Sequence, residues 1–80
     1  MTLEQILEIY PEEELIKADG FDDAVIGIDA VKLRLVYDID KMRSILVNEQ
    51  GMEFDDAMDY LDYNVLGSYL GEQTPLYIQI

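Results

Sequence analysis

Acidic side chains are concentrated in the stretch MEFDDAMDYLDYNVLG, residues 52–67. If this stretch forms a helix, Asp55, Asp59 and Asp62 follow one another at i, i+4 and i+7 and share one face. Carboxylates about one helical turn apart can imitate the spacing of phosphates along a nucleic acid backbone. The pattern therefore predicts a surface that occupies a basic cleft on a protein that handles DNA or RNA.

The same stretch carries no compensating positive charge, since no lysine or arginine follows Glu53. Like charges at i, i+4 destabilise a helix slightly, and soluble surfaces usually intersperse both signs. The helix dipole accounts for Asp55 and Asp56 near the expected helix start, but not for Asp59 and Asp62. Two interpretations are open: a binding surface, and a solvated face that only keeps the chain in solution.

Tyrosines accompany these carboxylates, and Tyr60, Tyr63 and Tyr69 are the nearest in the sequence. Tyrosine is enriched at the centres of protein interfaces. The alternative is ordinary half-buried packing, in which the hydroxyl reaches water. The predicted partner face comprises Glu53, Asp55, Asp56, Asp59, Tyr60, Asp62 and Tyr63.

The composition restricts the chemistry that the chain can perform. Eighteen acidic and five basic residues give a net charge of −13, which repels nucleic acids and anionic membranes. Neither cysteine nor histidine occurs, so thiolate nucleophiles, imidazole bases, disulfides and zinc or haem sites are excluded. We expect no enzymatic activity and no cofactor. The expected partner is a basic protein, with no direct binding to nucleic acid or to a membrane.

One group of carboxylates could still hold a cation. Asp19, Asp22 and Asp23 fall in one predicted turn, where two or three oxygens could hold Mg²⁺ or Ca²⁺ weakly. An enzyme that uses only carboxylates and a metal is the corresponding alternative. Aspartates clustered in a turn usually accept hydrogen bonds from their own backbone, and we expect that role here.

The N-terminal residues MTLEQILEIYPEEE lack the basic region and the apolar run of a signal peptide. No segment approaches the roughly 18 consecutive apolar residues of a membrane span. These patterns predict a cytoplasmic protein.

The length predicts a single domain over residues 1–80, and the N-terminal part predicts helices. Thr2 and Gln5 have the spacing of a capping box, which indicates a first short helix. Pro11 should end that helix and begin a second, because the glutamates that follow favour a helix start.

Two strands are predicted next, over residues 24–28 and 31–37, joined as a hairpin near Asp29-Ala30. One long bent strand is the alternative. In the second strand the alternation predicts one apolar face, made of Val31, Leu33, Leu35 and Tyr37.

The C-terminal half predicts two helices and a strand. Asp38 or Asp40 can cap the first helix, and Gly51 can end it in a left-handed conformation. The acidic stretch supplies the second helix, and residues 76–80 alternate as a final strand. The sum is an α+β fold of approximate order ααββααβ, with a small antiparallel sheet of about three strands packed against helices.

Short motifs at long spacing extend over about residues 21–76. They are Phe21-Asp22-Asp23-Ala24, Gly51-Met52, Asp56-Ala57, Tyr63-Asn64, Gly67, Gly71-Glu72 and Thr74-Pro75. The series resembles small acidic proteins of tailed bacteriophages and prophages, a set with no settled activity. The resemblance implies the cytoplasm of an infected or prophage-carrying bacterium, where small acidic phage proteins often bind host enzymes.

Taken together, these patterns predict a small acidic, non-enzymatic protein of phage type that binds and modulates or inhibits a basic host protein. Imitation of nucleic acid phosphates is the specific form of this hypothesis. The alternative is a structural or accessory phage protein that forms homo-oligomers by pairing through the C-terminal strand, Leu76 to Ile80.

Overall fold

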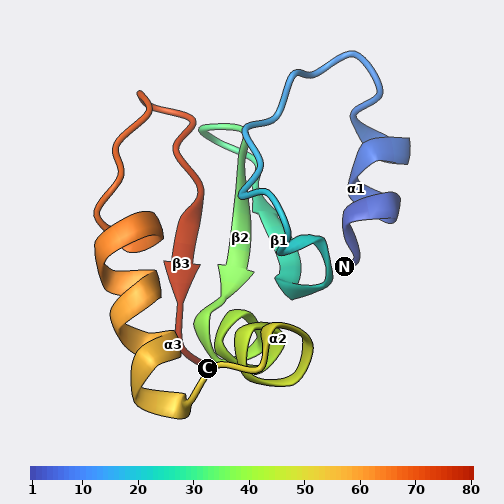
Figure 1. The fold of residues 1–80 in the computed structure, drawn as a ribbon. Helices are drawn as coiled ribbons and strands as arrows, with labels where there is room; N and C mark the ends of the chain where they lie inside the picture. Colours follow the sequence, from blue (N-terminus) through green and yellow to red (C-terminus); the bar gives the residue numbers. More distant parts are fainter.

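The sheet is organised around β2 (Arg34–Asp38), its central strand. In the computed structural model, which describes residues 1–80, β1 (Val25–Asp29) pairs antiparallel with β2, and β3 (Leu76–Ile78) pairs parallel with its other side. The other elements are α1 (Leu3–Ile9), the 3₁₀ turn η1 (Asp22–Ala24), α2 (Ile39–Gln50), α3 (Phe54–Leu61) and the π-helical turn η2 (Asp62–Leu66). Figure 1 shows α1 beside β1, α3 on the side of β3, and α2 at the lower end of the sheet.

The helix ends confirm the predicted capping residues. Thr2 Oγ1 accepts a hydrogen bond from Gln5 N, and Gln5 Oε1 accepts one from Thr2 N, which completes the capping box of α1. The carboxylate of Asp38 caps α2 by accepting from the N–H of Asp40 at 2.9 Å. Gly51 ends α2 with a φ of 71°, a left-handed conformation that glycine adopts without steric cost.

Asp29 stabilises the hairpin between β1 and β2. Its carboxylate accepts hydrogen bonds from the backbone N–H groups of Val31 and Lys32, at 3.1 and 3.4 Å, and from Arg34 Nε at 2.8 Å. Asp29 and Arg34 are also opposite each other in the strand register. Hydrogen bonds from the following backbone N–H groups to an aspartate carboxylate favour a turn. The predicted hairpin therefore forms, but its connection is longer than the expected Asp29-Ala30 link.

The strand after this turn is shorter than its alternation suggested. Val31 is 91% exposed, and Leu33 lies in the turn with a left-handed φ of 54°. The prediction that both belong to the strand is therefore wrong, whereas Leu35 and Tyr37 are fully buried, as predicted. The bonds to Asp29 draw residues 30–33 into the turn, so regular pairing begins only at Arg34.

The core forms on one face of the sheet, where Leu35 and Tyr37 project from β2. The other buried apolar side chains of this cluster are Leu3, Ile6, Phe21, Ala24, Val25, Met42, Leu46, Ala57 and Leu61. All three helices contribute, so each of them buries one side in the same core. The hydroxyl of Tyr37 accepts a hydrogen bond from Ala18 N at 2.9 Å, and burial raises the pKa of this phenol.

The opposite face of the sheet has no helical layer of the same kind. The parallel register pairs Val36 with Leu76, and Asp38 with Ile78, which places the apolar members of these pairs away from Tyr37. Val36, Leu76 and Ile78 are only half-buried, and none of them belongs to the core cluster or packs against it. This face is therefore apolar and incompletely covered.

The α+β class and the three strands are confirmed, but the sheet is mixed and not wholly antiparallel. The chain leaves β2, passes through α2 and α3, and returns to pair β3 parallel to β2. Parallel neighbours need such a crossover connection, whereas a short hairpin would have joined antiparallel strands. The spacing between residues 38 and 76 allowed either outcome.

The second short helix expected after Pro11 does not form. Residues 11 and 12 make a turn, and residues 13–18 have no regular structure. The preference of the glutamates for a helix start is a weak local effect, and tertiary packing overrides it. In the irregular conformation Leu15 and Ile16 are both half-buried, and the segment brings Ala18 to Tyr37.

The contact between Ala18 and Tyr37 gives a stability prediction. Tyr37→Phe removes the acceptor and leaves the partly buried N–H of Ala18 unpaired, which should lower the free energy of unfolding by about 1 kcal/mol. Urea unfolding followed by circular dichroism measures the loss. Tyr63→Phe is the control, because Tyr63 is 85% exposed and its change should have no effect. Equal stability of both variants would contradict the contact.

The hairpin gives a pH prediction. The hydrogen bond from Arg34 holds the pKa of the Asp29 carboxyl below its usual value, and partial desolvation opposes it less strongly. The folded chain therefore binds this proton more weakly than the unfolded chain. The resulting stabilisation is complete above the ordinary aspartate pKa of about 3.9 and is lost as the pH falls through the lowered pKa.

An NMR titration of the side-chain carboxyl carbon of Asp29 should show the lowered pKa directly. Arg34→Gln should move that pKa back toward the ordinary value, because it removes the charged donor. If the titration of Asp29 is the same in both proteins, the ion pair does not form in solution.

Candidate functional site

Helix α3 carries the candidate site because its sequence separates apolar from acidic residues. Ala57 and Leu61 are fully buried in the core. At 3.6 residues per turn, this burial turns Asp55, Asp59 and Asp62 to the opposite side. Together with Glu53 and Asp56 they form what we call the acidic face: Glu53, Asp55, Asp56, Asp59 and Asp62, all of them exposed. The structure thus brings together all five carboxylates that the sequence singled out.

None of the carboxylates of the acidic face has a basic partner. The two ion pairs of the chain join Asp29 to Arg34 and Asp40 to Arg43, and neither includes a residue of α3. Glu53 occupies the N-cap position of α3 without a side-chain capping bond. The negative charges of this face are therefore directed to solvent and are available to an external cation or basic protein.

One cation does approach α3, and sequence reasoning missed it. The guanidinium of Arg43, on α2, lies 4.5 Å from the centre of the Phe54 ring and donates to Met58 Sδ at 3.2 Å. It also pairs with Asp40 at 2.6 Å. Arg43 thus holds α2 against α3 through the aromatic ring and leaves the acidic face uncompensated. Asp40 and Arg43 have ion-pair spacing, but no sequence signal pointed to Phe54.

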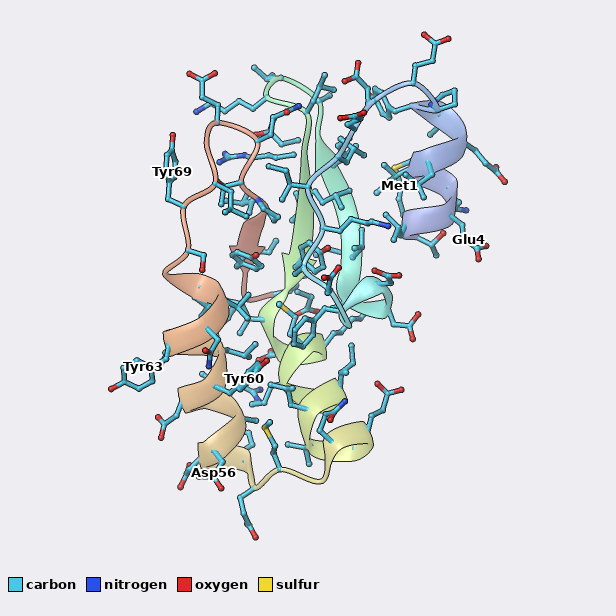
Figure 2. The ribbon with its side chains drawn as sticks, turned by 45° about the horizontal axis from the view of Figure 1, so that its top comes forward. Met1, Glu4, Asp56, Tyr60, Tyr63 and Tyr69 are labelled. Atoms are coloured by element: carbon cyan, nitrogen blue, oxygen red, sulfur yellow. The ribbon has the colours of Figure 1, made fainter.

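The tyrosines of the predicted partner face point in different directions. Tyr63 is 85% exposed and points away from the sheet (Figure 2). Tyr60 is 40% exposed and lies at the border of the acidic face, where it lines a groove next to α3. Tyr69, on the loop after η2, is 77% exposed. Tyr63 therefore shares the solvent-directed side of α3 with the carboxylates, whereas Tyr60 also lines the groove.

The groove separates α3 and η2 from the irregular segment before η1. It has a volume of about 220 Å³, and Phe21, Val65, Pro75 and Tyr77 supply apolar surface to it. Burial raises the pKa of the Tyr77 phenol, whose ring packs at 5.7 Å from that of Tyr37. Sequence analysis did not find this groove, because its walls come from segments far apart in the chain.

The aspartates of the predicted turn do not assemble into a metal site. Asp19, Asp22 and Asp23 are exposed, and Asp22 and Asp23 begin the 3₁₀ turn η1. Nowhere in the chain do three or more acidic side chains come together in an arrangement that could hold a metal ion. The helices are also too short or too polar for any of them to cross a membrane.

Comparison with protein-family models, with curated proteins and with solved structures found no match.

The position of each carboxylate along α3 gives a testable difference. Asp59 and Asp62 lie beyond the first turn of α3, where the helix dipole no longer favours negative charge, whereas Asp55 lies in the favourable first turn. Asp59→Asn/Asp62→Asn should raise the free energy of unfolding by roughly 0.5 kcal/mol through relieved repulsion. Asp55→Asn, the control, should not raise it. Urea unfolding at low ionic strength measures both variants, and a double variant less stable than the parent would show that these carboxylates have favourable partners.

Proposed function

We propose that this chain is a small, non-enzymatic binding protein that attaches to a basic bacterial protein through the acidic face of α3 and modulates or inhibits it. The observation that carries the proposal is the absence of an ion pair at any of the five carboxylates of that face, all of which are exposed. A face used only for solubility would ordinarily contain both signs of charge. This one attracts cations along its whole length.

The charge of the whole chain supports the same proposal. A net charge of −13 creates a field that attracts basic proteins and accelerates their encounter with the acidic face. Arginine and lysine side chains of the partner can then pair with the carboxylates, and Tyr63 offers an exposed aromatic ring beside them. Aromatic residues near the centre of an interface commonly contribute much of its binding energy.

The specific form of the proposal is competition with nucleic acid. Asp55 and Asp59 on α3 and Asp62 at the start of η2 present negative charge about one turn apart, and a row of negative charge is the property that a basic cleft recognises in a phosphate backbone. The resemblance to small phage proteins supports a setting in an infected or prophage-carrying bacterial cytoplasm. There, occupation of such a cleft on a host protein that handles DNA or RNA would exclude its natural ligand.

The test compares two variants with the same change in charge. Asp55→Asn/Asp59→Asn/Asp62→Asn neutralises the acidic face, and Glu4→Gln/Glu8→Gln/Glu12→Gln neutralises three exposed glutamates on or just after α1. Each protein is immobilised, exposed to bacterial lysate, and analysed by mass spectrometry of what it retains. We expect the α3 variant to lose a basic protein that the parent and the α1 variant retain.

Added salt tests whether the attraction is electrostatic, and added nucleic acid tests whether the acidic face occupies a nucleic acid site. Retention by the parent should weaken as ionic strength rises, because screening shortens the range of the attraction. Added duplex or single-stranded nucleic acid should release the partner if the acidic face occupies its nucleic acid site. Equal loss of the partner from both charge variants would mean that total charge, and not the acidic face, is responsible, which would refute the proposal.

A further inference from the structure

The outer edge of β3 is the one part of the sheet that stays open to another strand. Within the sheet, β3 pairs only with β2, and β2 is the only element against which it packs extensively. The N–H and C=O groups on the far side of an edge strand have no partner in the sheet and can pair with another chain. Gln79 and Ile80, which follow β3, are both exposed.

The other edge of the sheet is closed. Helix α1 packs beside β1 (Figure 1), and the amino group of Met1 donates a hydrogen bond to the carbonyl oxygen of Ile26 at 3.0 Å. The pairing of β1 with β2 is also irregular, because the register shifts between Val25 and Gly27. Such bulges and covering helices are the usual protections of an edge strand. A strand could therefore be added only at β3.

The edge at β3 lacks the protection that charge would provide. No charged side chain occurs from Gln73 to Ile80, although the chain as a whole carries a net charge of −13. Natural proteins commonly place lysine or another charged residue on an exposed edge to prevent pairing. Here the edge is flanked instead by apolar side chains: Leu76 and Ile78 are half-buried on the uncovered face, and Ile80 is 83% exposed.

We propose that two copies of this chain associate through β3, which pairs antiparallel with β3 of the second copy to form one continuous six-stranded sheet. A second copy fits this edge because two strongly acidic chains repel each other least where neither presents charged side chains. When identical strands pair antiparallel about a two-fold axis, both copies use the same surface and form the same backbone hydrogen bonds. Since β1 is closed, the assembly stops at two copies and does not extend into a fibre.

This dimer is independent of the proposed binding to a basic protein and should respond to salt in the opposite direction. Rising ionic strength screens the repulsion between two acidic chains, so it should strengthen the dimer, whereas it should weaken the capture of a basic partner. Sedimentation velocity of the purified chain over a wide range of concentration and salt measures the association directly.

A matched pair of variants locates the contact. Ile80→Glu places a negative charge beside the edge of β3, and Val31→Glu makes the same change at the hairpin turn, where Val31 is 91% exposed. We expect Ile80→Glu to weaken the dimer by about tenfold or more, because a charged side chain beside an exposed edge opposes strand pairing, and Val31→Glu to have little effect. Neither residue is in the core, so both variants should fold.

Hydrogen exchange supplies the second measurement. The amides of β3 should become more protected as the concentration of the parent chain rises, and those of β1 should not. A chain that is monomeric at every concentration and salt would overturn the proposal. So would a dimer that Ile80→Glu and Val31→Glu affect equally, or one whose concentration-dependent protection lies outside β3.

Discussion

The burial of Tyr37 on the central strand is the constraint on which the rest of this small fold depends. Its ring is fully buried, lies 5.7 Å from the ring of Tyr77 on β3, and stands opposite Val25 on β1. Its hydroxyl accepts the N–H of Ala18, which fixes the irregular segment before η1 across the same face. One side chain thus connects all three strands and the longest irregular segment of the chain.

The small size of the core explains where the charges lie. A chain of this length buries only about 60–65% of the surface that its unfolded form exposes, so each helix can bury one side and must leave the other in water. In α3 the buried side is made by Ala57 and Leu61. The opposite side could have carried any mixture of polar residues, and it carries aspartates. Burial therefore determines the orientation of the acidic face. The presence of aspartates on that face is a property of the sequence, and none of them forms an ion pair within the chain.

Charge is distributed unevenly over the surface, and this distribution is the common basis of the two proposals. The acidic face of α3 is a place where a second acidic chain cannot approach without repulsion, so it suits a basic partner. The segment from Gln73 to Ile80 has no charged side chain, which is the reason for proposing a second copy there. The two surfaces lie on different elements, α3 and β3, so the two proposals can be tested separately.

The sequence by itself determined the features that depend on residues a few positions apart. The capping box of Thr2 and Gln5, the cap at Asp38, the left-handed end at Gly51 and the hairpin near Asp29 all arise from local hydrogen bonds or backbone preferences. The five exposed carboxylates of α3 were predictable for the same reason. The period of the helix relates them directly to the apolar residues between them.

Only the tertiary structure decided the features that join distant segments. The parallel direction of β3 depends on the path of the chain through α2 and α3, and the contact of Arg43 with Phe54 depends on how those helices meet. The groove beside Tyr60 and the position of β3 at the edge of the sheet likewise depend on segments far apart in the chain, as does the contact of Ala18 with Tyr37. Local patterns allow several such arrangements, and burial of one shared core selects among them.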